Sequence, residues 1–302
     1  MQNISNQIKR VAKKLFLFVF IILSFSVFFR LSGGMTIEHS KNADIVTTSS
    51  DSAIFAQILN KFGYKDLSIN EYITEIGKFF IGTPYTSSTL DIDDNERLVI
   101  NLSEMDCVTF VEYVTAFALC FSNKEYDFDS FIQKLTLIRY KSGIIDGYSS
   151  RLHYFSDWLF DNTQKGIITI VSELIGNAQF DCYVNFMTTN PSFYKQLTNT
   201  SQISLMKTIE ASISSYSMKY ITKNYFKTAE SEILDGDIIA LTTSIKGLDV
   251  SHVGLAVIIK GRVHLLHASS TSKKVEITTI PFDDYLQKRT NVTGVLVGRL
   301  KK

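Results

Sequence analysis

Cysteine is scarce in this chain, and basic charge is not concentrated beyond its N-terminus. The 302 residues include three cysteines, Cys107, Cys120 and Cys182. Three are too few for a disulfide framework, and the odd number leaves at least one thiol unpaired within the chain. A Cys120–Cys182 bridge is compatible with an oxidising compartment, but the sequence does not decide whether it forms. The formal net charge is +1, and without clustered Lys and Arg we expect no nucleic-acid partner.

Motifs for metal or cofactor binding are also missing. The chain contains no Cys-x-x-Cys and no His-Glu-x-x-His. His264 and His267 lie on one predicted strand with odd spacing, so their imidazoles point to opposite faces and are poorly placed to share a metal ion. We therefore expect neither a metal site nor a cofactor.

The N-terminus has the layout of a secretory signal. Lys9, Arg10, Lys13 and Lys14 precede the uninterrupted apolar run 15–29. About 15 helical residues span ~22 Å, which is short of the ~30 Å hydrocarbon core of a bilayer. Residues 1–34 are thus predicted to be a signal peptide or, less favourably, an N-terminal anchor through 15–29, followed by a polar linker at 35–50. The predicted location is the periplasm or cell envelope, with membrane contact only through this leader.

The remaining residues, 51–302, predict a single domain of the α+β class. Apolar residues recur at helical spacing over 52–63 and 68–80. Short β-branched runs bounded by glycine at 237–242, 252–259 and 263–268 predict an antiparallel sheet near the C-terminus. The segment 122–232 lacks strong strand signals and is predicted to be a mainly helical insertion. Nothing in the sequence indicates more than a monomer.

Cys107 lies where a buried helix is predicted to begin. Asp106 suits the N-cap position, because its carboxylate can accept hydrogen bonds from free first-turn amides. The run from Val108 to Leu119 is apolar on nearly every side, which indicates a central core helix. The positive end of the helix dipole is expected to lower the pKa of a thiol at this position. A plain core cysteine is the alternative interpretation.

Two histidines fall on neighbouring predicted strands. If the turn at Lys260-Gly261 has two residues, Ile259 faces Arg262, and the side chains of His252 and His267 project from one face as diagonal neighbours. A three-residue turn would place them on opposite faces. Cysteine as nucleophile, His252 as general base and His267 as the group that orients the base would meet the needs of acyl transfer by a thiol.

Four short motifs stand in order along the chain: GTPY at 82–85, Asp106-Cys107 before an apolar helix, Gly236-Asp237 before a strand, and SHVG at 251–254 followed by HAS at 267–269. Together they resemble the NlpC/P60 superfamily of papain-like cell-wall cysteine peptidases and amidases. More narrowly, the stretches NLSEMDCVTFVEYV, RLHYFSDWLFDN, DGDIIALTT, GLDVSHVG and LLHASS resemble its DUF1460 branch, which is regarded as N-acetylmuramoyl-L-alanine amidase-like.

The resemblance implies an N-terminal helical part with the catalytic cysteine at a central helix, packed on a C-terminal antiparallel sheet. It also implies Cys107, His252 and His267 as the catalytic residues. Peptidoglycan or a muropeptide would be the substrate, with Tyr85, Asp106, Arg151 and Tyr154 as candidate binding residues. Thr109 and the run 86–88 depart from the wider superfamily pattern, so its endopeptidase specificity does not transfer directly.

Three functions remain open from the sequence. The first is an amidase that cuts between the lactyl group of muramic acid and L-Ala. The second is a γ-D-glutamyl endopeptidase that uses the same three residues within the stem peptide. The third, from another class, is a noncatalytic wall-binding module, against which the intact cysteine and histidines argue. The accepted stem peptides and sugar form are not predicted.

Overall fold

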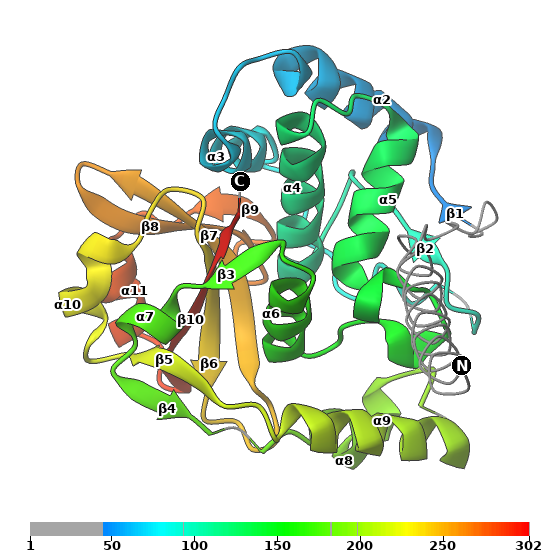
Figure 1. Ribbon diagram of the computed structural model, residues 1–302, viewed down its shortest axis with the longest axis vertical. Helices are drawn as coiled ribbons and strands as arrows, with labels where there is room; N and C mark the ends of the chain where they lie inside the picture. Colours follow the sequence, from blue (N-terminus) through cyan, green and yellow to red (C-terminus); the bar gives the residue numbers. More distant parts are fainter. Residues whose placement is uncertain (1–44, 93, 182, 198, 302) are drawn as a thin grey trace, which may run out of the picture. The chain divides into compact units, whose positions relative to one another are not determined.

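An antiparallel sheet lies beside the helices of the first half of the described chain, and two of its strands carry the candidate histidines (Figure 1). The computed structural model describes residues 45–301 except 93, 182 and 198. The predicted leader and all but the last six residues of the predicted linker lie outside the described residues, as does Cys182. Within the described part of the chain, no helix is both long and apolar enough to cross a membrane.

Helices form most of the first half of the described chain. The longer helices are α2 (Ser49–Ile58), α3 (Ile69–Phe79), α4 (Cys107–Ser122), α5 (Phe128–Arg139) and α6 (Phe155–Gln164). A π-helical turn, η1 (Leu59–Gly63), extends α2. Thr48 and Ser68 close capping boxes at the starts of α2 and α3, which satisfies amides that have no partner within the helix. The helices predicted over 52–63 and 68–80 are therefore confirmed to within a few residues.

The sheet has eight strands in the described residues, ordered β4-β5-β10-β6-β7-β8-β9, with β3 paired to the far end of β10. Its strands are β3 (Ile168–Ile170), β4 (Ala178–Phe180), β5 (Met218–Thr222), β6 (Ile238–Thr243), β7 (Val250–Ile259), β8 (Arg262–Ser269), β9 (Lys274–Ile277) and β10 (Val292–Leu300). Each neighbouring pair is antiparallel. Separately, β1 (Ile45–Val46) pairs in parallel with β2 (Leu98–Val99).

Side chains alternate between the two faces of the sheet and build a core on each. Leu255 and Leu266 join the larger core, to which α3, α4, α5 and α6 contribute. Their neighbours Ala256 and Leu265 join a smaller core on the other face. Three short helices help to cover that face, α7 (Ser172–Ile175), α10 (Phe226–Ala229) and α11 (Phe282–Gln287). The mixed α+β class predicted from the sequence is confirmed.

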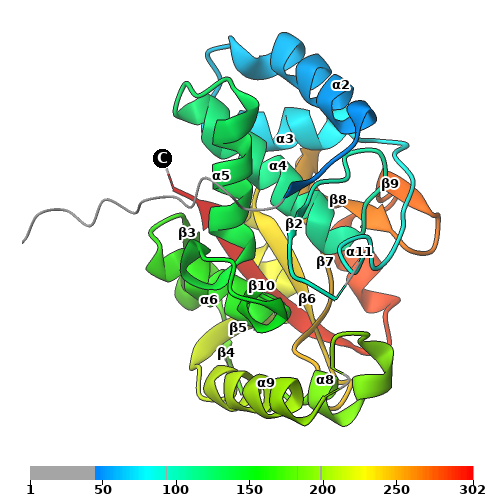
Figure 2. The same ribbon diagram turned by 90° about the vertical axis from the view of Figure 1, so that its right-hand side faces the viewer.

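The segment predicted to be a helical insertion is more mixed than expected. It holds α8 (Phe186–Thr189) and α9 (Thr200–Ile213), which lie together below the sheet (Figure 2). It also supplies β3, β4 and β5, which extend the sheet beyond β10. These strands are three to five residues long, too short for a clear alternating pattern in the sequence. Short 3-10 turns occur at Lys141–Gly143, Tyr148–Ser150, Pro191–Phe193 and Glu230–Glu232.

Candidate active site

Cys107 is the first residue of α4, as predicted. The Oδ1 atom of Asp106 accepts hydrogen bonds from the amides of Val108 and Thr109 at 3.0 and 2.8 Å. The Thr109 hydroxyl in turn accepts from the Asp106 amide at 2.9 Å. This reciprocal capping fixes the start of the helix. Cys107 is partly exposed there and packs against the larger core.

The turn between β7 and β8 has two residues. Ile259 pairs with Arg262 and Leu255 pairs with Leu266. Lys260 and Gly261 both have positive φ, 51° and 76°, as the type I′ turn of a two-residue hairpin requires. The predicted register is therefore confirmed, and it places both imidazoles on one face of the sheet.

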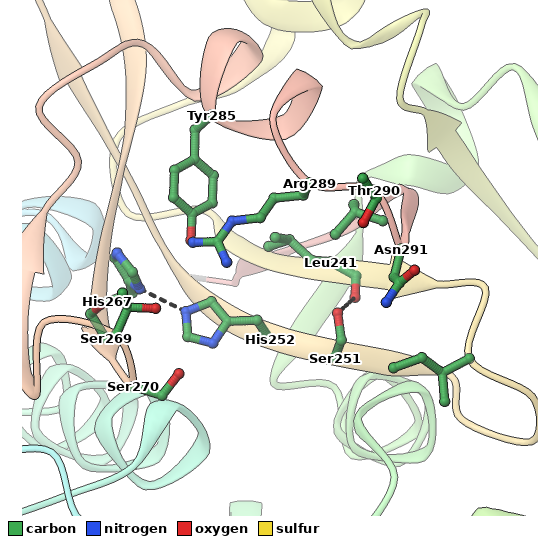
Figure 3. A pocket seen from close by; sticks show the side chains of 13 residues that line it. Leu241, Ser251, His252, His267, Ser269, Ser270, Tyr285, Arg289, Thr290 and Asn291 are labelled. Atoms are coloured by element: carbon green, nitrogen blue, oxygen red, sulfur yellow. Dashed lines mark hydrogen bonds between the residues drawn. The ribbon is translucent and has the colours of Figure 1, made fainter.

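The two imidazoles contact each other directly. His252 Nε2 and His267 Nδ1 are 2.6 Å apart, and the two rings are nearly perpendicular, at 87°. Figure 3 shows that the other ring nitrogen of His252, Nδ1, points away from His267. His267 is only 2% exposed. Nε2 of His252 is thus engaged by the buried ring of His267, and Nδ1 of His252 is left for another group.

The thiol lies against the strand that carries His252. Helix α4 packs on β7 and β8, and the backbone of Val253 forms a hydrogen bond with the Cys107 thiol. Val253 directly follows His252 in β7. The Cys107 thiol therefore lies against the histidine strand, next to the residue that follows His252.

The protonation of the site differs from the expectation based on the helix dipole. Burial and then the Asp106 carboxylate raise the pKa of the Cys107 thiol to about 12. Asp106 already accepts the hydrogen bonds of two first-turn amides, and its negative charge opposes a neighbouring thiolate. Burial followed by the charges of His267 and Arg289 lowers the pKa of His252 to about 3. The resting site is thus a neutral thiol beside a neutral imidazole.

Tyr85, a candidate binding residue from the resemblance, lies near the cysteine. Its ring is partly exposed, and burial and then the charges of Cys107 and Asp106 raise its pKa to about 12. A bridge between the backbones of Tyr85 and Met105 and a hydrogen bond from the Tyr85 amide to the Lys273 carbonyl, 2.9 Å long, fix this position. The structure therefore brings Tyr85, Asp106 and Cys107 together. Their contacts with a substrate stay predictions.

Arg151 and Tyr154, the two other candidate binding residues, have partners within the chain. The Arg151 guanidinium pairs with Asp91 at 2.7 Å and with Glu96 at 3.4 Å. The hydroxyl of Tyr154 donates to the Glu210 carboxylate at 2.7 Å, and Tyr154 is 2% exposed. These contacts organise the segment before α6. To bind a carboxylate of a substrate, Arg151 would have to give up its ion pair with Asp91 or Glu96.

A pocket of about 280 Å³ opens beside the histidines (Figure 3). It is lined by His252 and His267, by hydroxyls of the β8–β9 loop, and by Tyr285 and Arg289. Sequence reasoning did not single out these last two residues, because they belong to a short helix and its end without any recognisable motif. Among the described residues, no group of three or more His, Cys, Asp or Glu side chains is placed to hold a metal ion.

Comparison with known proteins identifies the class to which this fold and site belong. The model of the AmiA-like family, described as N-acetylmuramoyl-L-alanine amidase-like, matches residues 75–295. The chain therefore belongs to this family of amidase-like cell-wall hydrolases. No curated protein sequence matches it.

Solved structures agree with this assignment. The chain is 37% identical to an N-acetylmuramoyl-L-alanine amidase from Bacteroides uniformis, with a TM-score of 0.73 over 78% of this chain and 99% of that one. It is 41% identical to a Bacteroides fragilis protein named as a proposed xylanase, with a TM-score of 0.70 over 74% and 99% of the two chains. A Legionella pneumophila protein with the DUF1460 family model shares the fold, at 21% identity and a TM-score of 0.61 over 84% and 94%.

Proposed function

We propose that this protein is a cysteine amidase of the NlpC/P60, papain-like type that hydrolyses the bond between N-acetylmuramic acid and L-alanine in peptidoglycan or muropeptides. Its family and the Bacteroides uniformis amidase support the substrate. The observation that carries the mechanism is the 2.6 Å contact between His252 and His267 on the strands against which the Cys107 thiol lies. Thiol, base and orienting group are the parts that acyl transfer requires.

In the proposed reaction, Nδ1 of His252 takes the thiol proton as the sulfur of Cys107 attacks the lactyl carbonyl carbon. The protonated imidazole then gives this proton to the nitrogen of L-Ala, the C–N bond breaks, and the stem peptide leaves with a free amine. Water attacks the resulting thioester while His252 accepts a proton from it, and the thiol is regenerated. His267 accepts a hydrogen bond from Nε2–H of His252 and thereby keeps Nδ1 unprotonated in the resting enzyme.

The helix start also offers a donor for the developing oxyanion. The Asp106 side chain takes the amides of Val108 and Thr109 but not that of Cys107. The Cys107 amide belongs to the same residue as the attacking sulfur and is not used by the helix cap, and we assign it this role.

The name of the Bacteroides fragilis structure suggests glycoside hydrolysis as another function. That chemistry needs two carboxyl groups that face each other across the scissile bond. Here the carboxylate next to the cysteine, that of Asp106, caps α4, and two imidazoles lie opposite. The geometry favours an acyl-transfer enzyme.

Mass spectrometry of a muropeptide digested by the purified protein tests the proposal. We expect free N-acetylmuramic acid, or its disaccharide, together with an intact stem that begins with L-Ala. A shortened stem with the sugar still attached would instead establish the γ-D-glutamyl endopeptidase. An undigested muropeptide that still binds the protein would establish a noncatalytic wall-binding module. The predicted leader would place this activity in the periplasm or cell envelope.

A further inference from the structure

The pocket beside the histidines is lined by His252 and His267 and not by Cys107. In the proposed reaction His252 must touch both the thiol and the nitrogen of the leaving group, because it moves the proton from one to the other. A pocket lined by His252 can therefore receive the stem peptide whose nitrogen His252 protonates.

A cationic side chain stands at the far side of this pocket. Arg289 is exposed, and its guanidinium donates to the Tyr285 hydroxyl at 2.5 Å and stacks over the Tyr285 ring at 4.4 Å. Figure 3 shows this pair facing His252 across the pocket. The carbonyl of Arg289 accepts a hydrogen bond from Lys223 at 2.7 Å, which anchors the backbone.

The Arg289 guanidinium has no carboxylate partner in the part of the chain that the structure describes. The other polar side chains that line the pocket include the hydroxyls of Ser251, Ser270 and Thr271, which are neutral. An anionic ligand would therefore find one cation with several free donor groups and no competing carboxylate on the pocket wall.

We propose that Arg289 binds the free carboxylate of the second residue of the leaving stem peptide and selects substrates that carry it. This inference rests on the proposed function. A D-glutamate linked through its γ-carboxyl keeps its α-carboxylate, and two extended residues span about 7 Å, so this group would lie in the pocket while the L-Ala nitrogen is at His252. The ligand class is an anionic peptide, and its amidated form, with isoglutamine in place of glutamate, would lose the ion pair.

The test compares two substrates that differ in this one group and have the γ-carboxyl in a peptide bond, N-acetylmuramoyl-L-alanyl-γ-D-glutamyl-L-lysinamide and its D-isoglutaminyl counterpart. We expect kcat/KM to be higher for the carboxylate than for the carboxamide by about tenfold or more, since hydrogen bonds to charged groups are the stronger ones. Arg289→Gln is expected to bring this ratio close to one, and Arg289→Lys to leave it in between. Lys288→Gln removes a neighbouring exposed charge that does not line the pocket, and should keep the ratio of the original protein.

A ratio near one in the unmodified protein, or an unchanged ratio in Arg289→Gln, would overturn the inference while leaving the amidase proposal intact. If neither substrate is cleaved, the amidase proposal fails, and a binding measurement then decides on the pocket. Titration of Cys107→Ala with L-alanyl-γ-D-glutamyl-L-lysinamide should show binding that Arg289→Gln weakens about tenfold or more. Absence of binding, or equal binding by both proteins, would overturn the inference by itself.

Discussion

Asp106 and Cys107 are adjacent residues with opposed electrostatic effects at the same helix end. The free amides of a first turn favour a thiolate, but the Asp106 carboxylate accepts two of these amides and adds a negative charge. Burial acts in the same direction as that charge, so the pKa of the thiol is raised. In the proposed reaction the Cys107 thiol therefore depends on His252 to remove its proton during attack, and this is why the orientation of His252 by His267 would matter.

The neutral thiol has a measurable consequence for alkylation. Because the thiolate fraction of Cys107 keeps growing up to a pKa of about 12, the rate of reaction with iodoacetamide should rise continuously from pH 6 to pH 10. Mass spectrometry of the peptide that contains Cys107 measures this rate, and Cys107→Ser gives the background from the other cysteines. A plateau already reached below pH 8 would show a thiolate–imidazolium pair and contradict the neutral resting site.

At the scale of elements, the β7–β8 hairpin determines how closely the imidazoles approach. A Cβ atom added at Gly254 would lie 2.8 Å from the Leu266 carbonyl oxygen and 2.9 Å from Cβ of His267. The first of these atoms belongs to the backbone and the second is bonded to it, so neither can move away as the tip of a flexible side chain would. The absence of a side chain at this position thus allows the strand of His252 to pack tightly beside His267.

Gly254→Ala is accordingly expected to displace His267 and lower kcat by at least tenfold, because a misplacement of about 1 Å in a catalytic group costs on the order of a hundredfold in rate. Gly298→Ala on β10 is the matched control. Its added Cβ meets the tip of Leu159 at 2.9 Å, and β6 separates its strand from the strand of His252. Activity assays combined with thermal unfolding separate the two effects. Equal activities of the two variants would contradict the role assigned to Gly254.

Local chemistry made parts of the fold and site predictable from the sequence. Asp106 before an apolar run identifies a helix start, and Lys260-Gly261 identifies a two-residue turn, because both depend on a few neighbouring residues. Strand β10 was missed although it lies at the centre of the sheet between β5 and β6. Gly294 and Gly298 interrupt its apolar pattern, and a Cβ at Gly294 would lie 2.2 Å from the Ile221 carbonyl oxygen, a closeness that only the folded sheet reveals.

At the scale of the whole molecule, contacts between distant segments decide what each residue does. Arg151 finds its partner Asp91 60 positions earlier in the chain, and the pocket wall at Tyr285 and Arg289 comes from a helix on the face opposite α4. No local pattern contains this information. Sequence reasoning could therefore propose the nucleophile and its base. It could not predict the pocket beside them or the carboxylates that form ion pairs with Arg151.

The burial of His153, in the segment before α6, makes the stability of the fold depend on pH. Burial and then the Arg151 charge lower the pKa of His153 to about 3, from an ordinary value near 6.5. Between these two values the unfolded chain binds a proton that the folded protein does not. His153 therefore stabilises the fold above pH 6.5 relative to lower pH, and this contribution is lost as the pH falls toward 3.

His153→Gln should remove this dependence. Between pH 6 and pH 4.5, the free energy of unfolding of the unmodified protein should fall more steeply than that of the variant, by on the order of 1 kcal/mol per pH unit. Urea unfolding at several pH values measures both slopes, and the comparison cancels the contributions of other titrating groups. Parallel curves would show that His153 is protonated equally in the folded and unfolded states.

The most direct test of the account is the rate at which a defined disaccharide peptide releases its stem, measured side by side for the unmodified protein and for Cys107→Ala. Loss of the nucleophile should slow the release by about a thousandfold or more, while thermal unfolding shows that the variant stays folded. Release of the intact stem by the unmodified protein alone is the predicted result. Release by Cys107→Ala within tenfold of that rate would contradict the role of Cys107 as the nucleophile.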